Sequence, residues 1–458
     1  MIEELKPYEA LRPSGDPWLG EIPGHWAQKR LWSISSPRVE RNPGNLPLLS
    51  VFLDRGVIPY GEGGGQVHAP SLDLSNYQVV YPGDFVLNNQ QAWRGSVGVS
   101  RHHGIISPAY IVLRLNGELL PAYANYLFRC PRLVDQFVAA SKGVGDIQRQ
   151  VFWPFLRRVT VPVPSTAEQE AIVRFLDHAN RRIDQFICAK KKLIALLNEQ
   201  KQAIIHRTVT RGLAPSVKLK DSGVPWLGEI PSHWKILRAK HLYREVDERT
   251  TTGAEELLSV SHITGVTPRS EKNVTMFKAE SYAGHKLCRP GDLVINTMWA
   301  WMAALGVSRF TGIVSPAYAV YRPLADQALV DTYADALLRI RPYVSNYIVR
   351  STGIRASRLR LYPDQFFRVP IIVPPREEQQ KIVDHFNENT AGLSSAITQA
   401  DREIALIREY RTSLVADVVT GRLDVRTAAA SLSDLEPATA PSELQSDEHT
   451  DMDDNEAA

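Results

Sequence analysis

Two long stretches of the chain place apolar residues at alternating steps of four and three, which is the heptad spacing of a helix that packs along one seam. The first follows Pro164 and continues to about Thr208 without proline or glycine. The second lies in residues 375–424. The two seams consist of Ile172, Leu176, Ala179, Ile183, Phe186, Leu193, Leu197 and Ile204, and of Ile382, Phe386, Leu393, Ala396, Ala400, Ile407 and Leu414. The pattern predicts two helices of roughly 40 residues, each about 60 Å long, that can pair with each other.

Shorter apolar runs separated by Pro and Gly precede each heptad stretch and are typical of strands. Pro-Gly-Asp, a turn sequence, comes directly before two of these runs. We predict strands at 48–51, 56–57, 85–87, 111–113, 257–260, 265–266, 293–295 and 319–321, and helices at 122–137 and 330–349. The expected fold class is mixed α/β (α+β).

The second half of the chain repeats the first. The segment Pro17–Trp26 returns as Pro225–Trp234 with one difference, and Gly98–Arg114 matches Gly306–Arg322 at 12 of 17 positions. Glu-Gln followed by Ile-Val opens both heptad stretches. The repeating unit is therefore a whole globular domain with its helix, which is far longer than a solenoid repeat of about 20–50 residues.

Composition favours a soluble, cytoplasmic protein that binds a polyanion. Neither a membrane-spanning run nor a secretory leader is evident, and the three cysteines have no metal-ligand spacing. The net charge is +3, but residues 431–458 carry nine acids and no Lys or Arg, so the first 430 residues carry +12. A basic body suits nucleic acid, and an acidic tail poor in bulky apolar residues is expected to be disordered.

Motifs for catalysis or for cofactor binding are absent from the sequence. Ser107–Tyr110 and Ser315–Tyr318 resemble the tetrad of amino-methyltransferases, but they lack its second proline and no Gly-rich cofactor loop precedes them. We interpret them as turns that lead into strands. The glycine run 61–65 lacks the Lys of a phosphate-binding loop, and the histidines show no metal-binding pattern.

Two pairs of loops are candidates for DNA contact. Residues 88–94 and 296–302 share Asn and Trp positions but differ in the side chains best suited to read base edges. Residues 141–149 and 351–360 combine glycine with positive charge, which suits phosphate contacts. Ordinary surface loops remain an alternative for both pairs. The candidates are Asn89, Gln90, Gln91, Trp93, Arg94, Thr297, Met298 and Trp299 for base readout, and Lys142, Arg149, Arg355, Arg358 and Arg360 for phosphate.

Together these duplicated motifs resemble the specificity (S) subunit of type I restriction–modification enzymes. The motifs that carry the resemblance are Trp-Leu-Gly-Glu-Ile-Pro-x-His-Trp, Leu-Leu-Ser-Val with a following Gly-Val, Pro-Gly-Asp, Ser-Pro-Ala-Tyr and Pro-x3-Glu-Gln-x2-Ile-Val, each present twice between 17 and 424.

The resemblance implies two target recognition domains, each of which reads half of a split site in double-stranded DNA, joined by two long antiparallel coiled-coil helices. It also implies docking of methyltransferase (M) subunits, expected to be two, and of restriction (R) subunits. The chain itself would be non-catalytic and would bind no cofactor or metal; S-adenosylmethionine, ATP and Mg²⁺ would belong to the partner subunits. The expected parts are recognition domains at 1–163 and 223–374, helices at 164–211 and 375–424, a linker at 212–222 and a disordered acidic tail at 425–458.

Two other classes of protein fit parts of the sequence. One is a stand-alone DNA-modifying enzyme, a nuclease or methyltransferase with an unrecognised active site. The other is a coiled-coil interaction protein without a role on DNA. Turnover by the isolated chain would favour the first, and failure to retard duplex DNA at low salt would favour the second.

Overall fold

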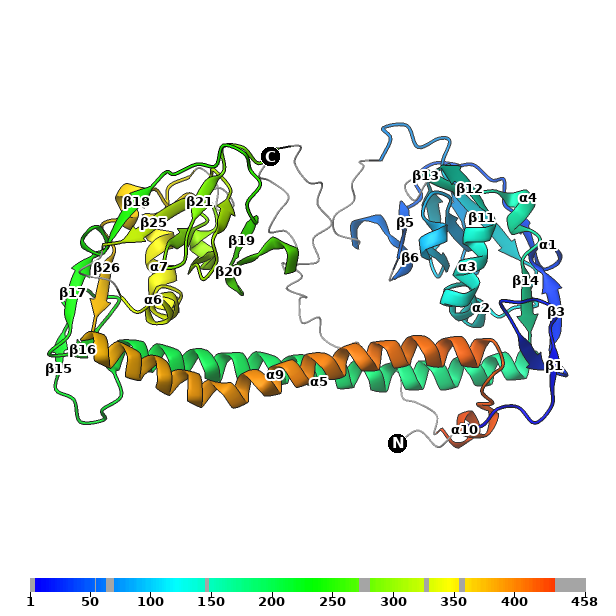
Figure 1. Cartoon of the computed structure of the whole chain (residues 1–458). Coiled ribbons are helices and arrows are strands. Elements are labelled where there is room, and N and C mark those ends of the chain that lie inside the picture. The colour runs from blue at the N-terminus through cyan, green and yellow to red at the C-terminus, as the bar shows by residue number, and fades with distance from the viewer. Residues whose placement is uncertain are drawn as a thin grey trace. The chain divides into compact units, whose positions relative to one another are not determined.

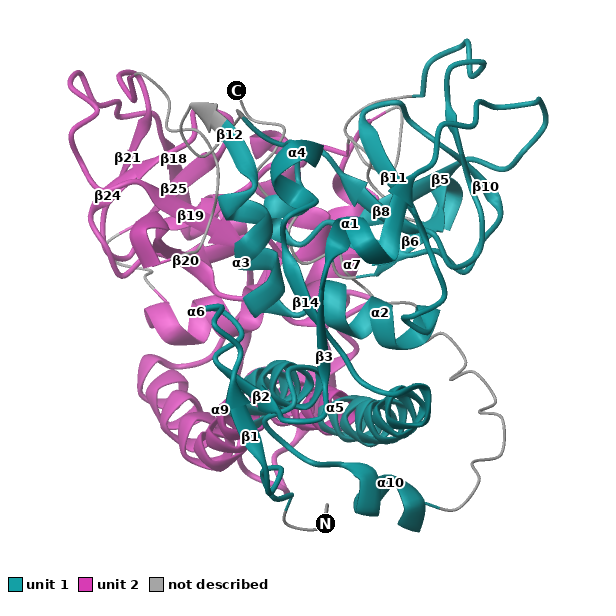
Figure 2. Ribbon diagram, turned by 90° about the vertical axis from the view of Figure 1, so that its right-hand side faces the viewer, with its two compact units in different colours: residues 1–190, 402–439 teal, residues 191–401, 440–458 magenta. Residues whose placement is uncertain are grey.

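The structure is a computed structural model that describes residues 5–53, 55–62, 70–144, 148–271, 281–324, 329–353 and 359–432. The chain divides into two compact units (Figure 2). Among the described residues, unit 1 comprises those up to Lys190 and those from Arg402 onward, and unit 2 comprises Lys191–Asp401. Each unit therefore holds one globular part and one half of each long helix. This division cuts across the linear boundaries expected from the sequence, because both helices contribute to both units.

The globular part of unit 1 is built on an antiparallel four-stranded sheet in the order β4-β11-β8-β9. Its apolar face packs against two helices that follow the sheet in sequence, with Phe85 stacked on Phe128 at a centroid distance of 3.9 Å. The strands are β1 Leu11–Pro13, β2 Glu21–Pro23, β3 Ala27–Arg30, β4 Ser35–Pro37, β5 Leu49–Phe52, β6 Gly56–Pro59, β7 Gln78–Val80, β8 Phe85–Asn88, β9 Val97–Val99, β10 Gly104–Ile106, β11 Tyr110–Leu115, β12 Ser141–Val144, β13 Gln148–Val151 and β14 Thr160–Val163. The helices are α1 Leu31–Ile34, α2 Pro121–Phe128, α3 Pro131–Ala139 and α4 Trp153–Leu156, with short 3-10 turns η1 Tyr60–Glu62 and η2 Ala92–Arg94.

Unit 2 repeats this architecture with the sheet order β18-β25-β22-β23. Its strands are β15 Leu219–Asp221, β16 Glu229–Pro231, β17 Lys235–Arg238, β18 Tyr243–Val246, β19 Leu258–Ser261, β20 Gly265–Pro268, β21 Lys286–Cys288, β22 Leu293–Ile295, β23 Leu305–Val307, β24 Gly312–Val314, β25 Ala319–Pro323 and β26 Pro370–Val373. Its helices are α6 Asp331–Leu338, α7 Arg341–Arg350 and α8 Pro363–Phe366, with 3-10 turns η3 Ala239–His241, η4 Arg269–Glu271 and η5 Ala300–Met302. The mixed α/β fold class expected from the sequence is confirmed.

The two heptad stretches form helices α5, Thr166–Arg211 with 46 residues, and α9, Arg376–Val419 with 44 residues. Figure 1 shows them side by side. In unit 1, Lys190 Nζ lies 2.6 Å from Glu403 Oε2, and Asp184 pairs with Arg411. In unit 2, Lys201 Nζ donates to Ser394 Oγ at 2.9 Å. Partners advance along one helix as they recede along the other, so the pairing is antiparallel.

The duplicated glutamines fasten each globular part to the beginning of a long helix. Gln169 Nε2 donates to Pro164 O at 3.0 Å, and its Oε1 accepts from Leu120 N at 2.7 Å. Gln379 makes the same two contacts in unit 2, with Pro374 O and Val330 N. Both amides are buried and use both of their functional groups, which explains why the residue recurs at this position.

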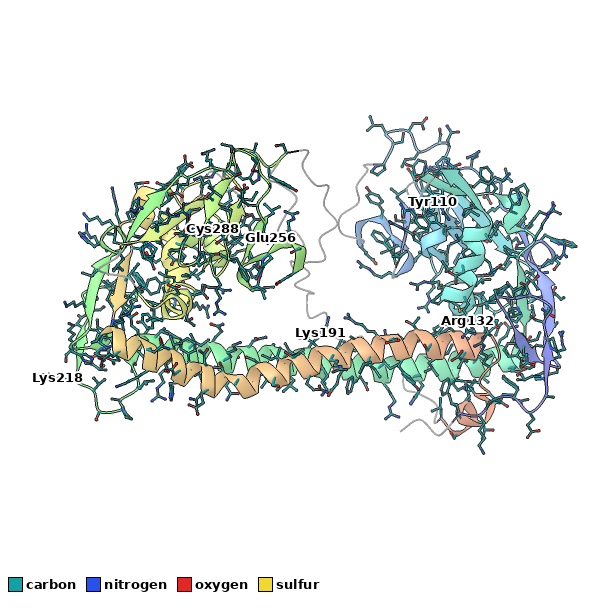
Figure 3. The ribbon with its side chains drawn as sticks, in the orientation of Figure 1. Tyr110, Arg132, Lys191, Lys218, Glu256 and Cys288 are labelled. Atoms are coloured by element: carbon teal, nitrogen blue, oxygen red, sulfur yellow. The ribbon has the colours of Figure 1, made fainter. Side chains whose placement is uncertain are left out.

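A tyrosine in each unit ties the globular part to the other helix. Tyr123 Oη donates to Val419 O at 3.2 Å in unit 1, and Tyr333 Oη donates to Val209 O at 3.0 Å in unit 2. Arg132, labelled in Figure 3, adds an ion pair with Asp417 at 3.1 Å. This pair lies where the globular part of unit 1 meets the end of α9. Each donor satisfies a carbonyl or carboxylate in the last turn of a helix, where the backbone oxygens lack partners.

Two sequence-based expectations are wrong in detail. The helix expected at 122–137 is two helices, α2 and α3, and the one at 330–349 is likewise α6 and α7. A new helix begins beside Pro131 and beside Pro342, because proline suits the first turn and disrupts a helix interior. The disorder expected from 425 onward is wrong for the first of these residues, because Val425 is buried and Arg426–Ser431 form α10. Residues 433–458 lie outside the described residues.

Candidate nucleic-acid interface

The loops after β8 and β22 are held by the same internal hydrogen bonds. In unit 1, Asn88 Oδ1 accepts from Gln90 N at 3.1 Å, and Trp93 Nε1 donates to Gln90 O at 2.9 Å. Asn88 lies opposite Tyr110 in the sheet, and burial raises the pKa of the Tyr110 phenol. Figure 3 shows Tyr110 in the sheet, away from α5 and α9. The Asn and Trp shared by both copies therefore form the frame of the loop.

Unit 2 has the same frame. Asn296 Oδ1 accepts from Met298 N at 3.2 Å, and Trp301 Nε1 donates to Met298 O at 2.8 Å. Thr297, a candidate for base readout, is buried, and its hydroxyl donates to Ala317 O at 2.9 Å. This residue is a correction to the sequence-based set, since its side chain points into the protein.

The structure brings the two predicted loops of unit 1 together. Val151 N donates to Asn89 O at 3.1 Å, so β13 lies against the loop that follows β8. The guanidinium carbons of Arg94 and Arg149 lie 5.0 and 5.7 Å from the centre of the Trp93 ring. The base-readout candidate Arg94 and the phosphate candidate Arg149 thus share one surface, in which both arginines lie over one half-buried indole.

Lys142 lies on the same β12–β13 ladder as Arg149, but one register position away, so the two side chains take opposite faces of the ladder. Lys142 is paired with Gln150 across the hairpin, and its Nζ lies 4.6 Å from the centre of the Phe155 ring. Lys142, Phe155 and Phe152 are exposed. Cations interleaved with exposed aromatic rings can contact both phosphates and bases. We call Trp93, Arg94 and Arg149 the first basic-aromatic surface. Lys142 and Phe155 form a separate cation–ring pair.

The equivalent loop of unit 2, residues 297–302, contains two tryptophans and no charged residue. Trp299 and Trp301 stack at a centroid distance of 5.7 Å and an interplanar angle of 19°. Leu361 N donates to Thr297 O at 2.9 Å, the counterpart of the link between β13 and the loop in unit 1. Arg360 is exposed and is paired through backbone hydrogen bonds with Thr352. Arg355 and Arg358, two of the phosphate candidates, lie outside the described residues.

Exposure separates the remaining candidates. Gln90, Gln91 and Arg94 are exposed, while Asn89 is half-buried and its Oδ1 has no hydrogen-bond partner among the described residues. Met298 and Trp299 are half-buried. The exposed polar residues of the first loop can donate to base edges without breaking any contact that holds the loop.

The aspartate of each Pro-Gly-Asp turn is structural. Asp84 accepts from Arg38 Nε at 2.6 Å, and Asp292 accepts from Arg322 Nε at 2.9 Å. Each carboxylate also accepts the backbone N–H three residues earlier. The hydrogen bonds from the arginines to the aspartates raise the pKa of both guanidinium groups. Arg38 follows β4 and Arg322 lies in β25, so the offset of the repeat does not align the two arginines.

Sequence analysis missed two groups of this interface. Phe155 supports Lys142, and Met302 occupies in η5 the position that Arg94 occupies in η2. The offset of 208 residues aligns Met302 with Arg94, so the signal for that residue was present in the sequence. Phe155 gave no such signal, because its relation to Lys142 depends on how α4 packs beside the hairpin.

Comparison with known proteins gives matches at the level of structure. No protein-family model matches the chain, and no curated protein matches it in sequence. A chain of a type I restriction–modification (R-M) system, from a structure concerned with complex assembly and conformational transition, aligns with a TM-score of 0.58 at 17% identity, over 87% of this chain and 98% of that chain. This chain shares the fold of that chain of a type I R-M system.

Two further solved structures are named as HsdS or S subunits. The HsdS subunit from Thermoanaerobacter tengcongensis aligns at 18% identity and a TM-score of 0.42 over 88% of this chain and 98% of that one. The type I R-M S subunit from M. genitalium aligns at 13% identity and a TM-score of 0.33 over 90% and 99%. The match at a TM-score of 0.58 confirms, for the fold, the resemblance stated from the duplicated motifs.

Within the described residues, no group of three His, Cys, Asp or Glu side chains is placed to hold a metal ion. None of the helices in the described ranges is long and apolar enough to cross a bilayer. Ser107–Tyr110 and Ser315–Tyr318 are turns ahead of β11 and β25, closed by backbone hydrogen bonds to Ser107 O and Ser315 O. They match the interpretation made from the sequence.

Proposed function

We propose that the chain is the DNA-specificity subunit of a type I R-M complex. In this proposal it binds a bipartite site in double-stranded DNA, one half-site for each unit, and it docks two M subunits and the R subunits. The chain acts by recognition and carries no catalytic residue. S-adenosylmethionine, ATP and Mg²⁺ belong to the partner subunits. The complex assembly named for the structural neighbour supports this choice of partners.

The observation that carries the proposal is the contrast between frame and surface in the two units. The hydrogen bonds of Asn88 and Trp93 are repeated by Asn296 and Trp301. The side chains between these frame residues differ at almost every position. A duplicated frame that carries different side chains suits two modules that read different base sequences.

The charge of the first basic-aromatic surface suits a polyanion. Arg94 and Arg149 lie over the ring of Trp93, and Arg94 makes no salt bridge among the described residues. Binding of phosphates by such cations releases counterions, and the affinity therefore falls as salt rises.

Methylation mapping tests the proposal directly. The host genome is mapped with the chain present and with its gene deleted, and the purified chain is assayed on duplexes together with its M subunits. We expect loss of methylation at one split sequence only. DNA binding that is indifferent to both half-sites would refute the proposal, and DNA cleavage or methylation by the isolated chain would favour a stand-alone enzyme.

The length of the helices offers a second test. Because α5 and α9 each contribute to both units, we expect helix length to determine the accepted spacing of the half-sites. Inserting a few residues into α5 between 184 and 201, with a matching insertion in α9, should change the spacer and leave the bases of each half-site unchanged. The same insertion in the linker at 212–222 serves as the control.

A further inference from the structure

The two candidate loops differ in chemistry at equivalent positions of one frame. Each loop is closed by a Trp indole bonded to the backbone and ends in a left-handed residue, Gly95 with φ 99° and Ala303 with φ 67°. The loops read Asn-Gln-Gln-Ala-Trp-Arg at 89–94 and Thr-Met-Trp-Ala-Trp-Met at 297–302. Side chains rich in hydrogen-bonding groups in unit 1 thus correspond to mostly apolar ones in unit 2.

In unit 1, Arg94 is positioned to present a guanidinium fork. Its guanidinium lies over the Trp93 ring at 5.0 Å, and the side chain is exposed. Stacking engages the face of the guanidinium and leaves its N–H groups at the edge available as donors. Arg149 lies over the same ring and adds positive charge. Of the four bases, guanine alone presents two acceptors, N7 and O6, side by side in the major groove, and Arg pairs with both.

In unit 2, Met302 stands in η5 where Arg94 stands in η2. Met298 and Trp299 replace Gln90 and Gln91. Trp299 stacks on Trp301, whose indole N–H is bonded to Met298 O. The loop contains no charged residue. The apolar group that a major groove offers to such a surface is the 5-methyl group of thymine.

From these observations we propose that the two units read their half-sites by different chemistry. Unit 1 reads a guanine through the guanidinium of Arg94, held by Trp93. Unit 2 reads a thymine through contact of its methyl group with Met298, Trp299 and Met302. This inference rests on the proposed function and names the bases that each recognition domain requires.

Base analogues that change one group at a time test the inference. The full chain in complex with its M subunits is bound to duplexes that carry 7-deazaguanine for guanine, or uracil for thymine, one position at a time. We expect 7-deazaguanine to weaken binding about tenfold at one or more guanines of the first half-site. Uracil should weaken binding about three- to fourfold at one or more thymines of the second half-site, the effect of one buried methyl group.

Arg94→Met is the matched variant, because the second copy carries methionine at this position of the same frame. We expect Arg94→Met to weaken binding about tenfold and to abolish the response to 7-deazaguanine in the first half-site, with no change in the response to uracil in the second. Met302→Ala should abolish only the response to uracil. Arg94→Lys keeps the charge and loses the fork, but its ammonium can still donate to N7, so it should bind more weakly and keep part of the response to 7-deazaguanine.

Three results would overturn the inference. The first is a first half-site without a sensitive guanine or a second half-site without a sensitive thymine. The second is an unchanged response to 7-deazaguanine in Arg94→Met. The third is an equal loss of affinity for every sequence in Arg94→Met, which would make Arg94 a phosphate contact. In all three cases specific binding to a split site would persist and the proposed function would stand. Absence of any sequence preference in the unmodified complex would overturn both.

Discussion

Glu168 offers the sharpest test of what holds unit 1 together. The carboxylate is buried in the first turn of α5 and accepts three side-chain hydrogen bonds, from Tyr8 Oη at 2.9 Å, from Trp26 Nε1 at 3.0 Å and from His25 Nε2 at 3.0 Å. Its negative charge also lies at the positive end of the helix dipole. Glu168→Ala removes all of these interactions at once.

The expected cost follows from the donors that are left behind. Tyr8 and Trp26 are buried, and an unsatisfied buried donor costs about 1–3 kcal/mol. His25 is half exposed and can turn to water, and the helix dipole contributes about 0.3–1 kcal/mol. Allowing for non-additivity, we expect Glu168→Ala to lower the free energy of unfolding of unit 1 by about 3–5 kcal/mol.

The second copy supplies the control. Glu378 is the equivalent residue, and it is bonded to the exposed His233 at 2.7 Å, whereas the buried Trp234 Nε1 has no partner among the described residues. We therefore expect Glu378→Ala to cost about 1 kcal/mol or less. The assay is hydrogen exchange during urea titration, with peptides from α2 and β3 reporting on unit 1 and from α6 and β17 on unit 2. Equal losses for the two variants would refute the reasoning.

Three further predictions concern packing and charge. Gly104→Ala should destabilise unit 1 by at least about 2 kcal/mol in thermal unfolding, because the new Cβ would lie 2.4 Å from a backbone oxygen. Gly392→Ala on α9, where nothing lies within 4 Å, should stabilise the protein by about 1 kcal/mol. If Gly104→Ala did not destabilise unit 1, the close approach at Gly104 would be contradicted. Tyr123→Phe and Tyr333→Phe should each cost about 1 kcal/mol in urea unfolding, since each removes one hydrogen bond to a helix end, and a loss from only one of them would show that the two units are not equivalent there. Arg360→Gln should reduce the slope of log affinity against log salt by about one on every duplex, and an unchanged slope would remove this residue from the phosphate contacts.

The repeat and the period of the apolar residues determined most of the fold from sequence. Heptad spacing predicted α5 and α9 because a helix that packs along its whole length must repeat its apolar side chains at that period. The duplicated Pro-Gly-Asp turns likewise predicted the strands that follow them, β8 and β22, because turn geometry depends on local backbone preferences. The differing loops were evident as candidates because the offset of the repeat aligned them.

Tertiary structure alone decided which of those residues meet. Arg149 lies 55 residues beyond Arg94 in sequence and shares the Trp93 ring with it only because β13 pairs its backbone with the loop after β8. Thr297 appeared suitable for contact with DNA, and the structure buries it. The division into compact units also escaped the sequence, since half of each helix packs with each globular part. Such contacts depend on chain segments far apart in sequence, and local periodicity carries no information about them.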